Sequence, residues 1–86
     1  MTVYLVHLED VGDDGLNAHE HFIYATLEDA KQKAQQLIQS YKNGYPNLFN
    51  DPNWEVEETD CSLEMYDKGY YCLNHIVIDI TKLEVQ

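Results

Sequence analysis

The segment TLEDAKQKAQQLIQSYKNG, residues 26–44, is the clearest structural signal in this chain. Thr26 is a residue type that begins helices, and Asp29 three positions later approximates a capping box. Lys42 suits the negative end of a helix dipole, and Gly44 is a typical stop residue. Apolar residues recur at helical spacing, whereas glutamines and lysines occupy the other side. The segment therefore predicts one amphipathic helix. Its apolar stripe comprises Leu27, Ala30, Ala34, Leu37, Ile38 and Tyr41.

Two segments before the helix predict a β-hairpin. Residues 3–8 are rich in β-branched and aromatic side chains and are apolar on both faces, which indicates a central strand. Residues 21–25 predict a second, short strand. Residues 9–17 contain four acidic residues and two glycines, so they predict an exposed acidic loop between the two strands.

The chain after the helix predicts a loop and further strands. Residues 45–53 are dense in Asn and Pro, which is typical of a loop. Residues 54–66 alternate between apolar and polar side chains with an interruption near Asp60, which leaves open one bent strand or two. Residues 67–69 predict a hairpin turn, and residues 70–81 a long last strand. The inward side chains expected here are Trp54, Val56, Cys61, Leu63, Met65, Ile76, Ile78 and Ile80.

Together these segments predict a single α+β domain over residues 1–86. The expected architecture is an antiparallel four- to five-stranded sheet with one helix packed on one face, in the order β-β-α-β-β. One helix cannot cover both faces of such a sheet. We therefore expect an uncovered face with aromatic and acidic side chains, which suits docking of a partner or of a second copy. The tyrosines expected there are Tyr4, Tyr66 and Tyr70 or Tyr71.

A three-residue turn at residues 67–69 would pair Tyr66 with Tyr70, and would thereby place Cys61 opposite His75. Cysteine beside histidine is one arrangement of a catalytic nucleophile. No oxyanion donor or orienting group accompanies this pair, and the chain contains no Walker loop, dinucleotide fingerprint, serine elbow or CxxC motif. The sequence therefore favours a protein that is not an enzyme and has no cofactor.

The charge of the chain is strongly negative. Sixteen acidic residues stand against five lysines, there is no arginine, and the formal net charge is −11. A chain of this kind repels the phosphates of nucleic acids and of anionic lipids, and it lacks the guanidinium fork that binds phosphate in bidentate fashion. The composition therefore excludes direct binding to nucleic acid and to anionic membrane surfaces.

The charge is also unevenly distributed along the sequence. Residues 27–43 carry a net charge of +1, which leaves −12 for the rest of the chain. A surface of one sign favours encounter with a basic protein partner, although a high negative charge also serves solubility. The carboxylates expected to bind such a partner are Asp10, Asp13, Asp14, Glu55, Glu57, Glu58, Glu64 and Asp67. In the 45–53 loop, Tyr45 and Phe49 are candidate aromatic anchors, or they close the core over the end of the helix.

The compartment is expected to be the cytoplasm. No apolar run approaches the roughly 20 residues of a membrane span, and the chain opens on a strand pattern without a basic leader. Cys61 and Cys72 fit this compartment as reduced thiols.

The sequence His19-Glu20-His21 supports an alternative function. Histidines two positions apart on a strand point to the same side, as a zinc site requires. A third ligand would have to be His7, His75 or Glu20. The acidic loop at residues 9–14 adds a possible Ca²⁺ or Mg²⁺ site at Asp10, Asp13 and Asp14, although its flanking strands and its spacing do not fit an EF-hand. The alternative function is thus a metal-binding or metal-regulated module. The competing interpretation is that these histidines and the acidic loop simply face water.

No motif assigns the chain to a family. Its small size, acidity and lack of arginine resemble several groups of small acidic inhibitors, among them bacteriocin and toxin immunity proteins, nucleic-acid mimics, and phage anti-restriction or anti-CRISPR proteins. This resemblance implies a non-catalytic protein that blocks a nuclease or another nucleic-acid-binding protein, with carboxylates in place of phosphates. A homodimer formed through the uncovered sheet face is the third hypothesis.

Overall fold

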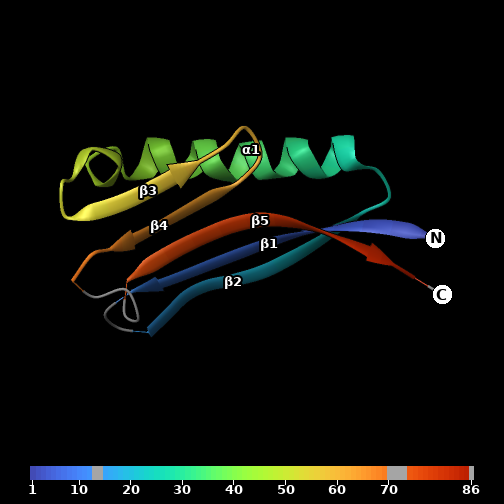
Figure 1. Ribbon diagram of the computed structural model, residues 1–86, viewed down its shortest axis with the longest axis horizontal. Helices are drawn as coiled ribbons and strands as arrows, with labels where there is room; N and C mark the ends of the chain where they lie inside the picture. The colour runs from blue at the N-terminus through green and yellow to red at the C-terminus, as the bar shows by residue number, and fades with distance from the viewer. Residues whose placement is uncertain (13–14, 70–73, 86) are drawn as a thin grey trace.

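The computed structural model describes residues 1–12, 15–69 and 74–85, and it confirms the α+β prediction (Figure 1). One helix packs against one face of a five-stranded antiparallel sheet with strand order β2-β1-β5-β4-β3. The elements are β1 (Thr2–Gly12), β2 (Gly15–Tyr24), α1 (Leu27–Gly44), the short 3₁₀ helix η1 (Leu48–Asn50), β3 (Trp54–Glu58), β4 (Leu63–Asp67) and β5 (His75–Glu84). The strands nearest the two termini, β1 and β5, are therefore neighbours inside the sheet.

Helix α1 begins as the sequence predicts. The backbone N–H of Asp29 donates to Thr26 Oγ1 at 3.2 Å, which satisfies one of the N–H groups that a helix leaves unpaired at its start. Ala30, Ala34 and Ile38 are buried against the sheet. The two alanines let the helix lie close to the strands, because neither projects beyond Cβ. The other residues of the expected apolar stripe are less buried: Leu37 and Tyr41 are half-buried, and Leu27 is exposed.

The core lies between α1 and the sheet. It is built from Val6 and Leu8 of β1, Leu63 and Met65 of β4, and Ile76 and Ile78 of β5 together with the helix. Successive side chains of a strand point to opposite faces, so the residues between these buried ones point away from the helix. The inward orientation expected for Trp54, Val56 and Ile80 is confirmed, since all three pack against the buried cluster.

The prediction of an exposed acidic loop at residues 9–17 is wrong. Strand β1 continues to Gly12 and β2 already starts at Gly15, while residues 13–14 lie outside the described part of the chain. The cross-strand ladder persists through this acidic stretch, with Glu9 opposite His19 and a bulge after Asp10. A strand tolerates carboxylates where one face of the sheet meets water, so the charge of this segment did not prevent pairing.

The expected register of the last hairpin is also wrong. Tyr66 pairs with His75, because β5 begins at that residue and not at residue 70; the intervening residues 70–73 are outside the described part. Register follows the buried set, which places Leu63 opposite Ile78 and Met65 opposite Ile76. Cys61 therefore does not lie opposite His75, and the pairing on which the hypothesis of a Cys–His nucleophile depended is absent.

Three smaller expectations are resolved as well. Residues 54–66 form two strands, with the turn between them closed by a hydrogen bond from the Thr59 N–H to the Ser62 carbonyl. Tyr4 packs against the core instead of lying on the uncovered face, because it shares the face of Val6. Within the described residues, no helix is long and apolar enough to cross a lipid bilayer.

Candidate functional site: the sheet face opposite the helix

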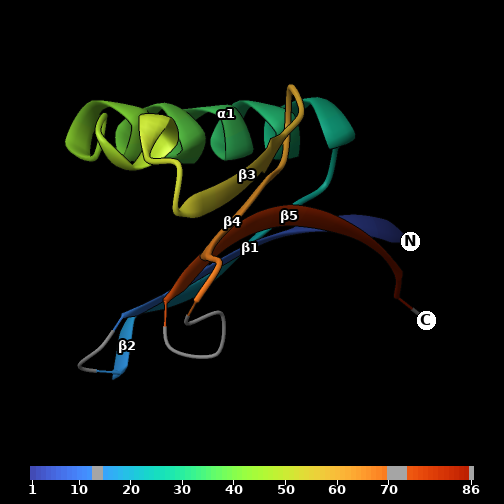
Figure 2. The same cartoon turned by 60° about the vertical axis from the view of Figure 1, so that its left-hand side comes forward.

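The face of the sheet opposite α1 is not covered by any other element of the described residues (Figure 2). We call it the open face. Alternation assigns to it the side chains next to the buried ones in each strand. Its central members are His7 and Glu9 of β1, His19 and His21 of β2, Glu55 and Glu57 of β3, Glu64 and Tyr66 of β4, and His75, Val77 and Asp79 of β5.

Among the described residues, five carboxylates from four strands gather on the open face, and we call them the open-face carboxylates. They are Glu9, Glu55, Glu57, Glu64 and Asp79. Glu57 lies directly opposite Glu64, and the same row continues through Val77 to Glu9. Because neighbouring strands are about 4.8 Å apart, this row places negative charges side by side across the sheet.

The lysines lie mainly elsewhere. Lys31, Lys33 and Lys42 are on α1, and Lys82 shares the helix-side face with its cross-strand partner Tyr4. Lys68 is the exception: its Nζ lies 3.6 Å from Oε2 of Glu55. The open face therefore carries carboxylates with Lys68 alone beside them among the described residues, whereas the helix side mixes its lysines with carboxylates such as Glu28, Asp29 and Glu58.

At the end of the sheet formed by the β3–β4 hairpin, the open face is hollowed. This hollow has a volume of about 530 Å³, and three open-face carboxylates line it: Glu57, Glu64 and Asp79. Val77 contributes apolar surface to the lining. The hollow thus combines concentrated negative charge with some apolar surface.

The structure brings together three of the predicted partner-binding carboxylates and separates the others. Glu55, Glu57 and Glu64 are on the open face. Glu58 points toward the helix side and forms an ion pair with Lys42. Asp67 accepts a hydrogen bond of 2.9 Å from the Gly69 N–H and so stabilises the turn after β4.

Asp10 has a structural role as well. Its Oδ2 accepts a hydrogen bond of 2.8 Å from the Tyr41 hydroxyl, and its Oδ1 lies 3.4 Å from Nδ2 of Asn17. Burial and this carboxylate both raise the pKa of Tyr41, because each disfavours a phenolate at that position. Asp10 thus joins β1 to α1. The predictions for Asp13 and Asp14 lie outside the described residues.

The two aromatic candidates differ from each other. Phe49 is half-buried against the core, with Nζ of Lys42 at 5.9 Å from its ring centre. Tyr45 is 52% exposed and stacks on Tyr41 at the end of α1. Phe49 therefore closes the core, as the alternative interpretation held, and Tyr45 remains accessible but lies away from the open face.

Sequence reasoning missed two of the open-face carboxylates. Glu9 fell in the expected loop, and Asp79 was counted only as part of the last strand. Glu9 Oε2 lies 3.0 Å from Nε2 of His75, and this hydrogen bond is the main reason that the pKa of Glu9 lies below its ordinary value. The period-two alternation of β1 beyond residue 8 is the sequence signal that could have placed Glu9 on this face.

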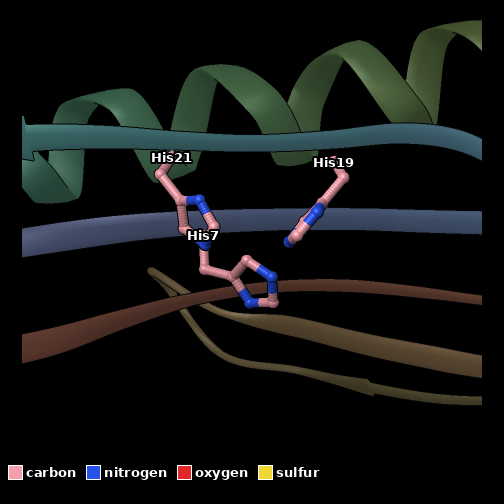
Figure 3. A group of neighbouring side chains, drawn as sticks. All are labelled: His7, His19 and His21. Carbon is pink, nitrogen blue, oxygen red and sulfur yellow. The ribbon is translucent and has the colours of Figure 1, made fainter.

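Three histidines meet on the open face, and we call them the histidine cluster (Figure 3). The ring centres of His7 and His21 are 4.9 Å apart with nearly parallel planes, and His19 lies 4.9 Å from His21 and 5.4 Å from His7. The sequence left three candidates for a third metal ligand, and of these His7 lies beside His19 and His21. Glu20 points to the other face, and His75 bonds Glu9.

Comparisons of the chain with protein-family models, with curated proteins and with solved structures find no match.

Proposed function

We propose that this protein is a non-catalytic binding protein whose open face occupies the basic surface of a partner protein, of the kind that otherwise binds nucleic acid. The observation that supports this proposal is the single sign of charge on the open face: among the described residues it holds five carboxylates with only Lys68 beside them, whereas the helix side mixes the other four lysines with carboxylates. A surface of one sign raises the rate of encounter with a surface of the opposite sign and repels partners of its own sign.

The rows of carboxylates suit a surface that evolved to hold phosphates. Such a surface presents lysine and arginine side chains that neutralise a regular series of negative charges. Glu57 and Glu64, with Asp79 on the neighbouring strand, offer carboxylate oxygens at strand spacing around one hollow. Arginine binds carboxylates and phosphates with the same fork geometry, so carboxylates can occupy its phosphate-binding positions.

The open face also supplies the non-ionic part of a stable contact. Tyr66 lies half-buried among the carboxylates, and tyrosine is enriched at interface hot spots. At the end nearest the termini, Ile23 is 67% exposed and Leu83 is 40% exposed. An interface needs such an apolar portion, since ion pairs at its rim contribute little affinity.

A foreign basic partner is favoured over a second copy of the chain. A two-fold dimer formed through the open face would bring the same carboxylates of both copies into one interface, and like charges placed together cost binding energy. The proposal includes a cytoplasmic location, which the free thiol of Cys61 supports.

The test compares two variants with the same change in net charge. Glu57→Gln/Glu64→Gln removes two open-face carboxylates, and Glu20→Gln/Asp60→Asn removes two exposed acids elsewhere. Immobilised wild type and both variants are exposed to nuclease-treated lysate at low salt and eluted in steps to about 1 M salt, where the Debye length falls to about 3 Å. A basic protein is expected in stoichiometric amount on the wild type and on the control variant, and at lower salt or not at all on the open-face variant.

Two results would contradict the proposal. Equal loss in both double variants would mean that net charge alone retains the protein. Scattered basic proteins that leave all three surfaces at low salt would mean that no specific partner uses this face.

A further inference from the structure

We propose that the histidine cluster is a binding site for one divalent transition-metal ion, with Zn²⁺ as the best-suited ion. The inference rests on His7, His19 and His21 and is independent of the protein partner proposed above. One potential ligand atom from each of the three imidazoles lies within 4.8 Å of those of the other two. His19 and His21 extend from β2 and His7 from β1, and the three rings lie close together on one face of the sheet (Figure 3).

The backbone positions the three ligands. His7 pairs directly with His21 across the β1–β2 ladder, and Glu9 pairs with His19, so His19 is the diagonal neighbour of His7. Residues 19 and 21 project from the same face because they are two apart on a strand. The buried neighbours of His7, Val6 and Leu8, fix which face β1 presents. A one-residue slip would send His7 into the core, so the register that buries this core also assembles the cluster.

The distances require only a small movement. Three atoms separated by no more than 4.8 Å lie within about 2.8 Å of a common centre, whereas Zn²⁺–N bonds are about 2.0–2.1 Å. A shift of under about 1 Å for each nitrogen would therefore bring all three to bonding distance. Because the rings of His7 and His21 are nearly parallel, side-chain rotation must also turn their nitrogen lone pairs toward the ion. His19 and His21 are exposed, so rotation of their side chains does not disturb the core.

The ligand type selects the class of ion. Imidazole nitrogens suit Zn²⁺, Ni²⁺ and Cu²⁺, whereas Ca²⁺ and Mg²⁺ prefer oxygen ligands. Three protein ligands leave one tetrahedral position, and here it opens toward solvent because the cluster lies on the open face. Water or a side chain of a partner can occupy that position.

The carboxylates around the cluster favour a cation. Asp79 Oδ1 lies 3.6 Å from Nδ1 of His7, where it can orient the ring as carboxylates commonly do for metal-bound histidines. Glu9 pairs with His19 across the β1–β2 ladder and lies two residues from His7 on the same face. Two negative groups thus flank the site without belonging to the ligand set.

The test uses protein without a polyhistidine tag, stripped with a chelator and dialysed. Zn²⁺ is titrated by calorimetry into wild type, His19→Gln, His21→Gln and the control His75→Gln, which removes the fourth histidine of the same face. We expect one saturable Zn²⁺ per chain in wild type and control. Loss of an outer partner of a metal site costs about 10–100-fold in affinity, so loss of a direct ligand should cost at least as much.

A second measurement identifies the ligands directly. Zn²⁺ should shift the ring ¹⁵N NMR signals of His7, His19 and His21 and leave those of His75 nearly unchanged. Unsaturable binding, equal loss of affinity in the control, or equal shifts at all four rings would indicate adventitious binding and overturn the proposal. Circular dichroism of the metal-free variants confirms that each one is folded before it is compared.

Discussion

The Tyr41 hydroxyl links α1 to the sheet. It donates to Asp10 Oδ2, and its pKa is raised by burial and by that carboxylate. The folded state therefore holds this proton more tightly than the unfolded chain, in which tyrosine titrates near 10. Its contribution to stability is fully present below about pH 10 and declines as the pH rises above it.

Tyr41→Phe provides the test of this linkage. The free energy of unfolding of the wild type should fall more steeply than that of Tyr41→Phe when the pH is raised from about 8 to about 10.5. Urea unfolding at several pH values measures both. If the difference between the two proteins stays constant over this interval, the hydroxyl does not titrate as the geometry requires.

Single side chains also show what could be predicted from the sequence. The outward orientation of Glu55 and Glu57 follows from local alternation alone. His19 and His21 likewise share a face because of their spacing. The third member of the cluster could not be chosen among His7, His75 and Glu20 from the sequence. The position of His7 beside the other two histidines depends on the pairing of β1 with β2.

Among the elements, α1 was the most predictable. Its cap, stripe and stop signal are all local, and the structure begins the helix at the residue after Thr26. The ends of β1, β2 and β5 were predicted poorly, since cross-strand hydrogen bonds determine where a strand stops. The acidic composition of residues 9–17 indicated a loop, yet the ladder to β2 extends to Gly12.

The β3–β4 hairpin contains a pair of like charges that should lower stability. Glu57 and Glu64 lie directly opposite each other, and like charges in that position destabilise an antiparallel pair. We expect Glu57→Gln and Glu64→Gln each to raise the free energy of unfolding by about 0.2–1 kcal/mol. Glu55→Gln is the matched control. This substitution removes the ion pair with Lys68, so it should not raise the free energy of unfolding.

Urea unfolding at low salt measures these differences. High salt should reduce the gain, since it screens the repulsion that the substitution removes. A loss of stability in Glu57→Gln or Glu64→Gln would mean that these side chains stabilise the sheet. Their position opposite each other would then need no functional explanation.

The molecule as a whole has two unlike sides. The helix side holds the core contacts, the Asp10–Tyr41 and Lys42–Glu58 links and most of the lysines. The open face holds the open-face carboxylates and the histidine cluster. Because β1 and β5 run side by side through the sheet, residues from opposite ends of the chain contribute to the same surface. Its assembly could not be predicted from local patterns.

The central claim is that binding to basic surfaces occurs on the open face. The most direct measurement is a titration of ¹⁵N-labelled protein with an oligoarginine peptide at low salt, followed by backbone amide NMR. We predict that the largest shifts fall on β3, β4 and β5 around Glu57, Glu64 and Asp79, and that they disappear as salt screens the charges. Shifts centred on α1, or spread evenly over both sides of the molecule, would contradict the account.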